Sequence, residues 1–186
     1  MSLKIALLPG SRRGEVSSLL PPMLDAVSIL GDVDAYVIQA PTIAARELVE
    51  LMAGRHTFVR IVEHDGGQAI AEADVALSSS GTATLECAVI GTPVVVMYKL
   101  TAITHLLAKR LVKLPHFGLI NIIAGAEVVP ELIQKDVNGE RIAAEVRKLV
   151  ERYPEVVREL EEVKARLGGP GASRRAAEAI MSVLRS

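Results

Sequence analysis

Short apolar runs alternate with longer amphipathic segments along most of the chain. A short apolar run bounded by turn residues is typical of a strand buried on both faces, whereas apolar positions three and four residues apart indicate a helix. The runs predict strands at Lys4–Leu8, Ala35–Ile38, Thr57–Val62, Val75–Leu77, Val94–Met97 and, as a short last one, Leu119–Ile122. Helices are predicted at Glu15–Leu30 (with a restart at Pro21-Pro22), Ile43–Met52, Gly67–Glu72, Thr82–Ile90 and Thr101–Leu114. This alternation predicts an α/β fold with a Rossmann-like, doubly wound parallel sheet.

The pattern changes after Val129, where no further strand is predicted and helical periodicity takes over. A helix is expected to begin near Pro130, and others at Asn138–Arg152, Pro154–Leu167 and Ser173–Leu184. The residues Gly168-Gly169-Pro170-Gly171 neither continue a helix nor add to a sheet, so they form a candidate hinge. We therefore expect a Rossmann-like domain over residues 1–167, followed by a hinge and a helical carboxyl-terminal tail over residues 168–186.

The last predicted helix carries an apolar stripe formed by Ala176, Ala179, Ile180 and Val183. A stripe of this kind needs a surface to cover it. Self-association is one way to cover it, and a homodimer is expected on that ground.

Composition and charge narrow the classes of function. Hydrophobic residues make up 50% of the 186 residues and aromatic residues only 3%, so the core must be aliphatic. Lys and Arg number 21 against 22 for Asp and Glu, which argues against a nucleic-acid partner. The single cysteine, Cys87, and four scattered histidines make no recognisable metal motif, so no metal is expected. No apolar run is long enough to span a bilayer and no signal-peptide cleavage region follows Met1, which predicts a cytoplasmic chain.

The turn Pro9-Gly10-Ser11-Arg12 follows the first predicted strand and precedes the first helix. In open α/β sheets, ligands collect outside the carboxyl ends of the strands. Gly10 permits a positive φ and a close backbone approach, Ser11 offers a hydroxyl, and Arg12 offers a bidentate donor for phosphate. An anionic ligand is one interpretation of this turn. A plain strand-ending turn with a solvated arginine is the other.

A second polar turn, Ser78-Ser79-Ser80-Gly81-Thr82, follows the strand Val75–Leu77. Its hydroxyls and the first N–H groups of the next helix are donors that point in the same direction, away from the strand end. Glu86 lies four residues after Thr82 on the same helix face, where a carboxylate can accept hydrogen bonds from sugar hydroxyls. The alternative is a serine-capped helix with Glu86 in solvent. The cluster of small polar residues at a strand end favours the binding site.

A long segment without Asp or Glu carries several basic residues. Lys109, Arg110 and Lys113 lie on an amphipathic helix, which fits an anionic membrane surface, a phosphate-bearing partner or a solvated face. Lys99 directly follows a buried strand, at the edge where ligands collect. Asn121 stands among isoleucines and is expected either to bond to the backbone or to face a ligand.

Four stretches, LLPGSRRGEV, ADVALSSSGTATLECAVIGTPVVVMYKL, LAKRLVKL and INIIAGAEVVPELIQ, resemble in order and spacing the carboxyl-terminal half of lipid-A-disaccharide synthases. The resemblance covers nearly the whole chain and is strongest at residues 5–16 and 74–134. It implies one half of a GT-B fold, in which two Rossmann-like domains face a cleft, and this half would hold the UDP-sugar donor. The implied reaction is the inverting transfer of 2,3-diacylglucosamine from its UDP conjugate to 2,3-diacylglucosamine 1-phosphate, in lipid A biosynthesis.

The resemblance also implies roles for individual residues. The turn at Gly10 would face the diphosphate, and the loop and helix from Ser80 to Glu86 would surround phosphate and ribose. Asn121 matches the asparagine of the family's Leu-Pro-Asn motif, although Ile120 stands where the family has proline. The donor-binding residues expected on this basis are Gly10, Ser11, Arg12, Ser80, Gly81, Thr82, Glu86, Lys99 and Asn121.

Finally, the resemblance implies partners outside this chain. The family's amino-terminal domain, which binds the acceptor, has no counterpart here, so we expect an excised domain that binds UDP or UDP-sugar and is inactive alone. Expected partners are the UDP-sugar, that missing domain, the lipid substrates and the inner-membrane surface, which implies a cytoplasmic, peripheral location. No cofactor or metal is expected. The alternatives are another UDP-sugar GT-B protein, such as a 2-epimerase or half of a peptidoglycan glycosyltransferase, and a noncatalytic nucleotide-binding module.

Overall fold

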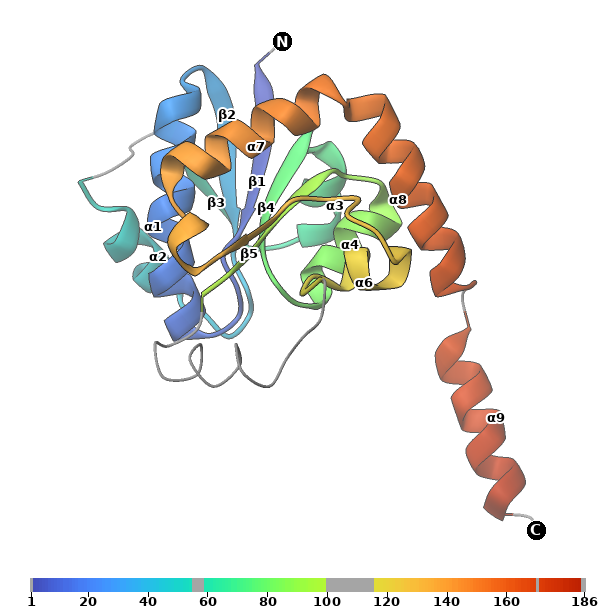
Figure 1. Cartoon of the computed structure of the whole chain (residues 1–186). Helices are drawn as coiled ribbons and strands as arrows, with labels where there is room; N and C mark the ends of the chain where they lie inside the picture. Colours follow the sequence, from blue (N-terminus) through green and yellow to red (C-terminus); the bar gives the residue numbers. More distant parts are fainter. Residues whose placement is uncertain (1, 55–58, 100–115, 170, 185–186) are drawn as a thin grey trace.

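The computed structural model describes residues 2–54, 59–99, 116–169 and 171–184, which form an α/β body and one projecting helix (Figure 1). The predicted helix Thr101–Leu114 lies outside the described residues, and so do Lys109, Arg110 and Lys113. The predicted strand Thr57–Val62 is described only from residue 59 onward.

The sheet has six parallel strands in the order β3-β2-β1-β4-β5-β6. The strands are β1 (Leu3–Leu8), β2 (Val33–Ile38), β3 (Arg60–Val62), β4 (Val75–Ser79), β5 (Val94–Tyr98) and β6 (Glu131–Ile133). In register, Ile5 of β1 stands between Ala35 of β2 and Val75 of β4. The chain thus winds outward from β1 in one direction and then from β4 in the other, which confirms the doubly wound parallel sheet.

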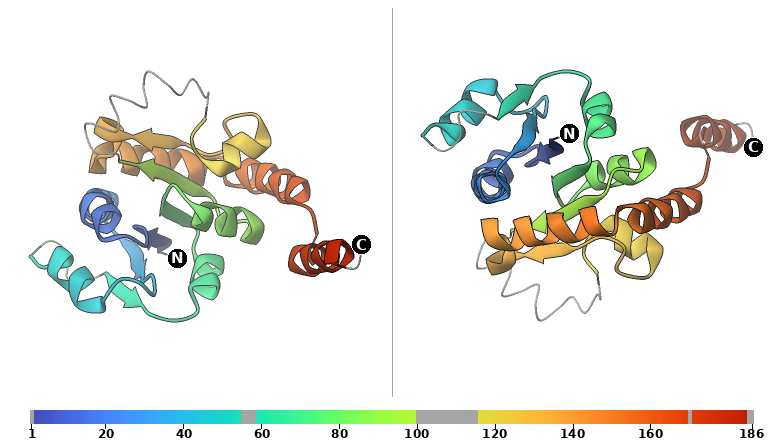
Figure 2. Two further views of the ribbon diagram at one scale, coloured as in Figure 1. Left: turned by 90° about the horizontal axis from the view of Figure 1, so that it is seen from below. Right: turned by 90° about the horizontal axis from the view of Figure 1, so that it is seen from above.

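Two layers of helices cover the sheet. The helices are α1 (Arg13–Leu30), α2 (Ala45–Met52), α3 (Gly66–Glu72), α4 (Thr82–Ile90), α6 (Leu119–Ala124), α7 (Gly139–Glu151), α8 (Tyr153–Leu167) and α9 (Ala172–Leu184), with a 3-10 turn at Gln134–Asp136. Helices α1 and α2 lie on one face and α3 and α4 on the other (Figure 2). Helix α7 packs against α1, whereas α6 and α8 pack with α4. Both faces of the parallel sheet are therefore closed to water.

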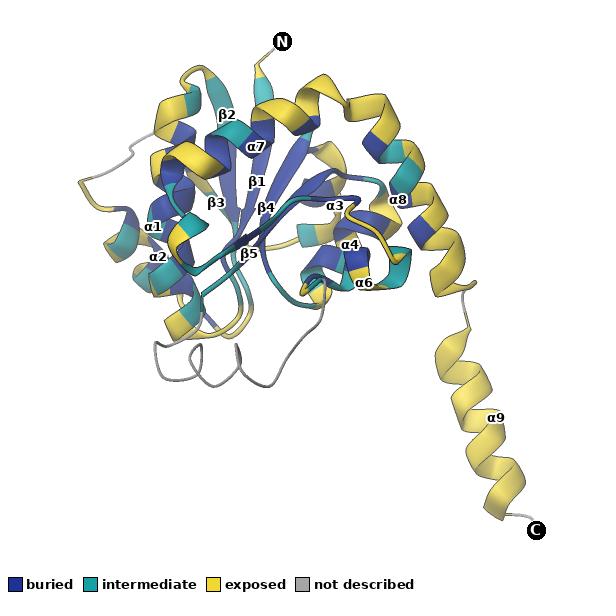
Figure 3. Ribbon diagram, viewed as in Figure 1, coloured by how far each residue is buried: buried dark blue, intermediate teal, exposed yellow. Residues whose placement is uncertain are grey.

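The core is aliphatic, as the composition predicts. The central strand β4 is buried along its whole length, and β1 is buried from Ile5 onward (Figure 3). Ile5, Leu7 and Leu77 are completely inaccessible. Such strands carry no inward and outward alternation because both their faces meet helices.

Helix α1 corrects the expected restart at Pro21-Pro22, because it runs unbroken from Arg13 to Leu30 with both prolines inside it. Each proline removes one backbone N–H donor from the helix. The buried face of α1, which includes Leu20 and Met23, packs on the sheet and on α7 on either side of the prolines. This packing holds the helix together across the missing donors.

The segment from 119 to 133 was predicted wrongly in two places. Leu119–Ile122, predicted as a strand, belongs to helix α6. The sixth strand comes instead at Glu131–Ile133, where a helix near Pro130 was expected and no further strand was predicted. A short apolar run does not by itself distinguish a strand from a helix.

The carboxyl-terminal helices were predicted correctly to within two residues. Asn138 caps α7, because its side-chain oxygen accepts the Arg141 backbone N–H at 2.9 Å. The glycines before α9 end α8, and Gly168 adopts a φ of 81°. Helix α9 then projects away from the body, and every one of its described residues is exposed (Figures 1 and 3). Self-association through its apolar stripe stays a prediction.

Because none of the described residues of α9 is buried, removing this helix should not destabilise the body. A chain that ends at Leu167 should differ from the full chain by less than about 0.5 kcal/mol in free energy of unfolding, the range expected for surface changes. Urea denaturation measures this, at a concentration where light scattering shows monomers. A loss above about 1 kcal/mol would mean that α9 packs on the body.

Candidate functional site

A cavity of about 710 Å³ opens at the carboxyl ends of β1 to β4. Strand order reverses between β1 and β4, which is where open α/β sheets bind ligands. The cavity is lined by the turn after β1, the loops after β2 and β3, and the turn after β4. Its lining residues are Leu8, Gly10, Ser11, Arg12, Glu15, Ile38, Gln39, Ala40, Pro41, Val62, Glu63, His64, Asp65, Gly66, Ser79, Ser80, Gly81, Thr82, Ala83 and Glu86.

Gly10 shapes the first wall. Its φ is +117°, in the region that favours glycine. A Cβ added there would lie 2.6 Å from Glu15 Oε2 and 2.8 Å from Glu15 Cβ. The turn therefore needs glycine both for its backbone conformation and for the close approach of the Glu15 side chain.

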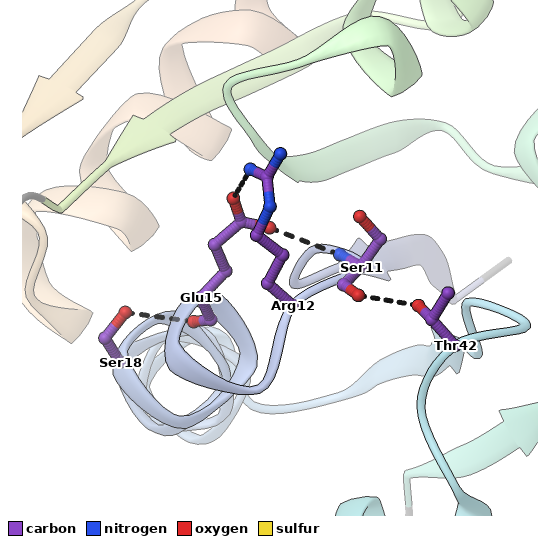
Figure 4. Close-up of polar contacts among 5 residues, drawn as sticks. All are labelled: Ser11, Arg12, Glu15, Ser18 and Thr42. Atoms are coloured by element: carbon purple, nitrogen blue, oxygen red, sulfur yellow. Dashed lines mark hydrogen bonds and ion pairs between the residues drawn. The ribbon is translucent and has the colours of Figure 1, made fainter.

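Ser11 and Arg12 present donors at the start of α1 (Figure 4). The Ser11 backbone N–H donates to Glu15 Oε2 at 3.3 Å, and Arg12 Nη1 donates to Glu15 Oε1 at 2.9 Å. The Ser11 carbonyl oxygen accepts the Thr42 hydroxyl at 2.6 Å, which ties this turn to the loop after β2. The Arg12 side chain is 81% exposed, so its guanidinium can reach a ligand.

The second wall is the turn from β4 into α4. The Ser80 backbone N–H donates to the Met97 carbonyl at 2.8 Å, which fixes the turn to β5. Gly81 precedes α4 and has no side chain to cap it, so the first N–H groups of the helix lack a side-chain partner there. The Thr84 hydroxyl donates back to the Gly81 carbonyl at 2.7 Å. Glu86, one turn into α4, is exposed and lines the same cavity.

The loops after β2 and β3 complete the cavity with residues that the sequence did not indicate. Gln39 donates through Nε2 to the Ile43 carbonyl at 2.6 Å, and its Oε1 is buried without a hydrogen-bond partner among the described residues. His64 and Asp65 follow β3, and Asp65 has a φ of 57°, a conformation that Asp tolerates better than most residues. The sequence does contain one sign of this loop, because the turn residues Asp65-Gly66-Gly67 come shortly after the predicted strand.

The structure thus brings most of the predicted donor-binding residues together. The seven residues Gly10, Ser11, Arg12, Ser80, Gly81, Thr82 and Glu86 line one cavity. Lys99 and Asn121 do not line it. Lys99 Nζ donates to the Ser18 carbonyl of α1 at 3.4 Å. The ligand-binding role of all nine residues stays a prediction.

Asn121 is completely buried, and its amide is used by the protein itself. Its Oδ1 accepts the backbone N–H groups of Val128 and Val129 at 2.8 and 3.0 Å. Its Nδ2 donates to the Val129 carbonyl and to Glu131 Oε1, both at 2.7 Å. Glu131 also accepts the backbone N–H groups of Phe117 and Gly118. Asn121 and Glu131 therefore join helix α6 to strand β6, which matches the expectation of a backbone-bonded asparagine.

Cys87 is part of the buried core. Burial raises the pKa of the Cys87 thiol to about 12, so the thiol stays protonated at neutral pH and packs as part of the core. Among the described residues, no group of His, Cys, Asp and Glu side chains could hold a metal ion. The sequence also contains one Asp-x-Asp triplet, Asp32-Val33-Asp34, a pattern that can bind a metal ion and that the expectation of no metal did not consider. It lies at the amino end of β2, away from the cavity, and Asp34 pairs with Arg60 at 3.2 Å.

Within the described ranges, no helix is both long enough and apolar enough to cross a bilayer.

Comparison with known proteins identifies relatives along almost the whole chain. Residues 2–180 match the family model described as lipid-A-disaccharide synthetase. The chain is 42% identical over 190 aligned residues to the lipid-A-disaccharide synthase of Anaeromyxobacter dehalogenans strain 2CP-C, covering 97% of this chain and 49% of that protein. It is 41% identical to the synthase of Syntrophus aciditrophicus, with the same coverage. The chain thus spans about half the length of the curated relatives it matches.

Solved structures share the fold at low sequence identity. The calicheamicin glycosyltransferase CalG4 aligns with a TM-score of 0.63 and 16% identity, over 98% of this chain and 42% of that chain. The UDP-GlcNAc 2-epimerase of Neisseria meningitidis aligns with a TM-score of 0.62 and 17% identity, over 97% and 45%. MurG of Acinetobacter baumannii aligns with a TM-score of 0.57 and 21% identity, over 98% and 50%. These similarities show that this chain shares its fold with about half of each of those chains.

The burial of Asn121 predicts a large effect on stability. Replacing it with alanine leaves two backbone N–H groups and one carbonyl without their partner, so N121A should lower the free energy of unfolding by about 2–4 kcal/mol. N138A, which removes a helix cap, should cost about 1 kcal/mol and serves as the matched control. Urea denaturation measures both. A cost for N121A no larger than that for N138A would contradict the structural role.

Proposed function

The chain belongs to the lipid-A-disaccharide synthetase family, and on that premise we propose that it is the half of a glycosyltransferase that binds the UDP-sugar donor. The observation that carries this proposal is the cavity at the reversal of strand order, where Arg12 and the amino terminus of α4 are donors suited to phosphate and Glu86 is an acceptor suited to sugar hydroxyls. The donor would be UDP-2,3-diacylglucosamine, the nucleotide sugar of the reaction that the family resemblance implies.

The two walls suit the two polar parts of UDP. We propose that Arg12 and the Ser11 N–H bind the diphosphate, because a guanidinium and a backbone amide are both strong donors to phosphate oxygens. The first N–H groups of α4, after Gly81, add the partial positive charge of a helix amino terminus. Glu86 would accept hydrogen bonds from the ribose hydroxyls, which need an acceptor rather than a positive charge.

The proposed reaction proceeds with inversion at the anomeric carbon of the donor. The 6-hydroxyl of the acceptor sugar attacks that carbon, the new glycosidic bond forms, the bond to UDP breaks, and the hydroxyl proton passes to a base. Negative charge develops on the leaving diphosphate. Arg12 and the amino terminus of α4 would stabilise this charge where it forms.

The acceptor and the base belong to the other half of the protein in this proposal. Both sugars must be held in line for attack, and much of the rate of such a reaction comes from that positioning. The 49% coverage of the relatives leaves room for a second domain of similar size. The lipid substrates further suggest a peripheral location at the inner membrane, where Lys109, Arg110 and Lys113 could meet anionic headgroups.

UDP binding is the direct test. The chain should bind UDP saturably in a calorimetric titration, and R12A should weaken binding roughly tenfold to a hundredfold, since hydrogen bonds to charged groups contribute about 1.5–3 kcal/mol. E86A should weaken UDP binding roughly tenfold but leave pyrophosphate binding nearly unchanged, because Glu86 is assigned to the ribose.

Arg13 supplies the matched control for R12A, and Glu50 supplies the matched control for E86A. Arg13 pairs with Glu47 at 2.7 Å, and Glu50 pairs with Arg46 on α2; neither Arg13 nor Glu50 lines the cavity. R13A and E50A should therefore change UDP affinity by less than about twofold. Equal losses in R12A and R13A would point to general charge attraction and would contradict a specific phosphate site.

The chain alone should not transfer the sugar. With UDP-2,3-diacylglucosamine and 2,3-diacylglucosamine 1-phosphate both present, it should release UDP no faster than buffer, because the acceptor wall is missing. Mass spectrometry of the lipid products measures the disaccharide. Disaccharide formed above the buffer rate by a preparation free of full-length enzyme would refute the proposal that the acceptor and the base need the other half of the protein.

A further inference from the structure

The carboxylate of Glu15 sits where the turn after β1 would hold an anion. It accepts hydrogen bonds from the Ser11 backbone N–H at 3.3 Å and from the Arg12 guanidinium at 2.9 Å. It also rests against the backbone of Gly10, where an added Cβ would come within 2.6 Å of Oε2. An acidic side chain of the protein itself therefore occupies two donors of this turn, the Ser11 N–H and one guanidinium nitrogen of Arg12 (Figure 4).

The contacts of Glu15 are easily exchanged. The Arg12 side chain is 81% exposed and that of Glu15 is 29% exposed, so water screens their ion pair. Pairs of this kind contribute only about 0–1 kcal/mol. A diphosphate carries more negative charge than one carboxylate and can accept two parallel hydrogen bonds from a guanidinium, whereas Glu15 accepts one from Arg12, so it can replace Glu15 there.

We infer that Glu15 is an internal competitor for the anion that binds at this turn. Its carboxylate holds Ser11 and Arg12 when no anion is bound at the turn and leaves them when a diphosphate binds. The inference rests on the proposed function only for the identity of that anion. Glu15 thus lowers the affinity for a diphosphate-bearing ligand, and it favours the release of UDP after transfer because it can return to the same donors.

The opposite role for Glu15 makes a different prediction. Glu15 is the third residue of α1, the position from which a carboxylate commonly supports a helix start. If it stayed in place and aimed Arg12 at the ligand, its removal would weaken anion binding. The substitution E15Q separates the two roles because glutamine keeps an acceptor oxygen and the side-chain length but removes the negative charge.

The experiment is a calorimetric titration of the 186-residue chain with inorganic pyrophosphate, in the unaltered protein, E15Q and E47Q. Glu47 pairs with Arg13 and does not line the cavity, so E47Q removes the same charge nearby without freeing the turn. E15Q should bind pyrophosphate roughly three- to tenfold more tightly, and E47Q should stay within about twofold of the unaltered chain. E15A should show a gain in the same direction, which guards against an effect peculiar to glutamine.

Three results would overturn the inference. They are unchanged or weaker pyrophosphate binding by E15Q, an equal gain in E47Q, and no saturable pyrophosphate binding by any of the proteins. Uridine is the control ligand, since it has no phosphate, and tighter uridine binding by E15Q would also refute competition for an anion. Repeating the series with UDP separates the two proposals: a gain for pyrophosphate without UDP binding would refute the donor-binding function and leave the role of Glu15 intact.

Discussion

The reversal of strand order between β1 and β4 is the constraint on which the rest of the structure depends. β1 pairs with β2 on one side and with β4 on the other, and both strands end at the same edge of the sheet. Helix α1 leaves that edge over one face, and helix α4 leaves over the opposite face. The two connections therefore diverge, and the space between them becomes the cavity. A parallel sheet that wound in one direction only would have no such gap.

A firm base lies beneath this gap because helices cover both faces of the central strands. Helix α7 returns after β6 to pack beside α1 and against β4 and β5, while α8 closes the other layer against α4. The central strands are packed mainly through aliphatic side chains, and the buried hydroxyls of Tyr36 and Ser78 are hydrogen-bonded, that of Tyr36 to the Ala69 carbonyl at 2.6 Å. The two turns are therefore held at fixed positions by strands that cannot shift separately. That rigidity suits a site in which donors must be in place before a charge develops.

The sequence predicted the sheet and the two polar turns for a physical reason. Runs such as Ile5–Leu8, bounded by turn residues and alternating with amphipathic helices, are typical of covered parallel strands, and the carboxyl ends of such strands share one edge. The structure of residues 119–133 could not be predicted in this way. Helix α6 and strand β6 are joined by a contact between Asn121 and Glu131, which are ten positions apart, and no periodicity in the sequence reveals such a contact. Gln39 reaches the cavity because β2 pairs with β1, and His64 because β3 pairs with β2. The position of Glu15 depends on its close approach to Gly10. None of these follows from local pattern.

The short strands at the two borders of the sheet affect how copies of this chain meet one another. β3 and β6 have three residues each, so a strand from another molecule would find few backbone groups to pair with. Glu131 begins β6 with its carboxylate turned to the amino terminus of α6, and Arg60 begins β3 with its guanidinium over the ring of Tyr36 and near Asp34. Charged residues on brief border strands discourage extension of a sheet from molecule to molecule. The short, charged borders of this sheet therefore offer little for a strand of another molecule to extend.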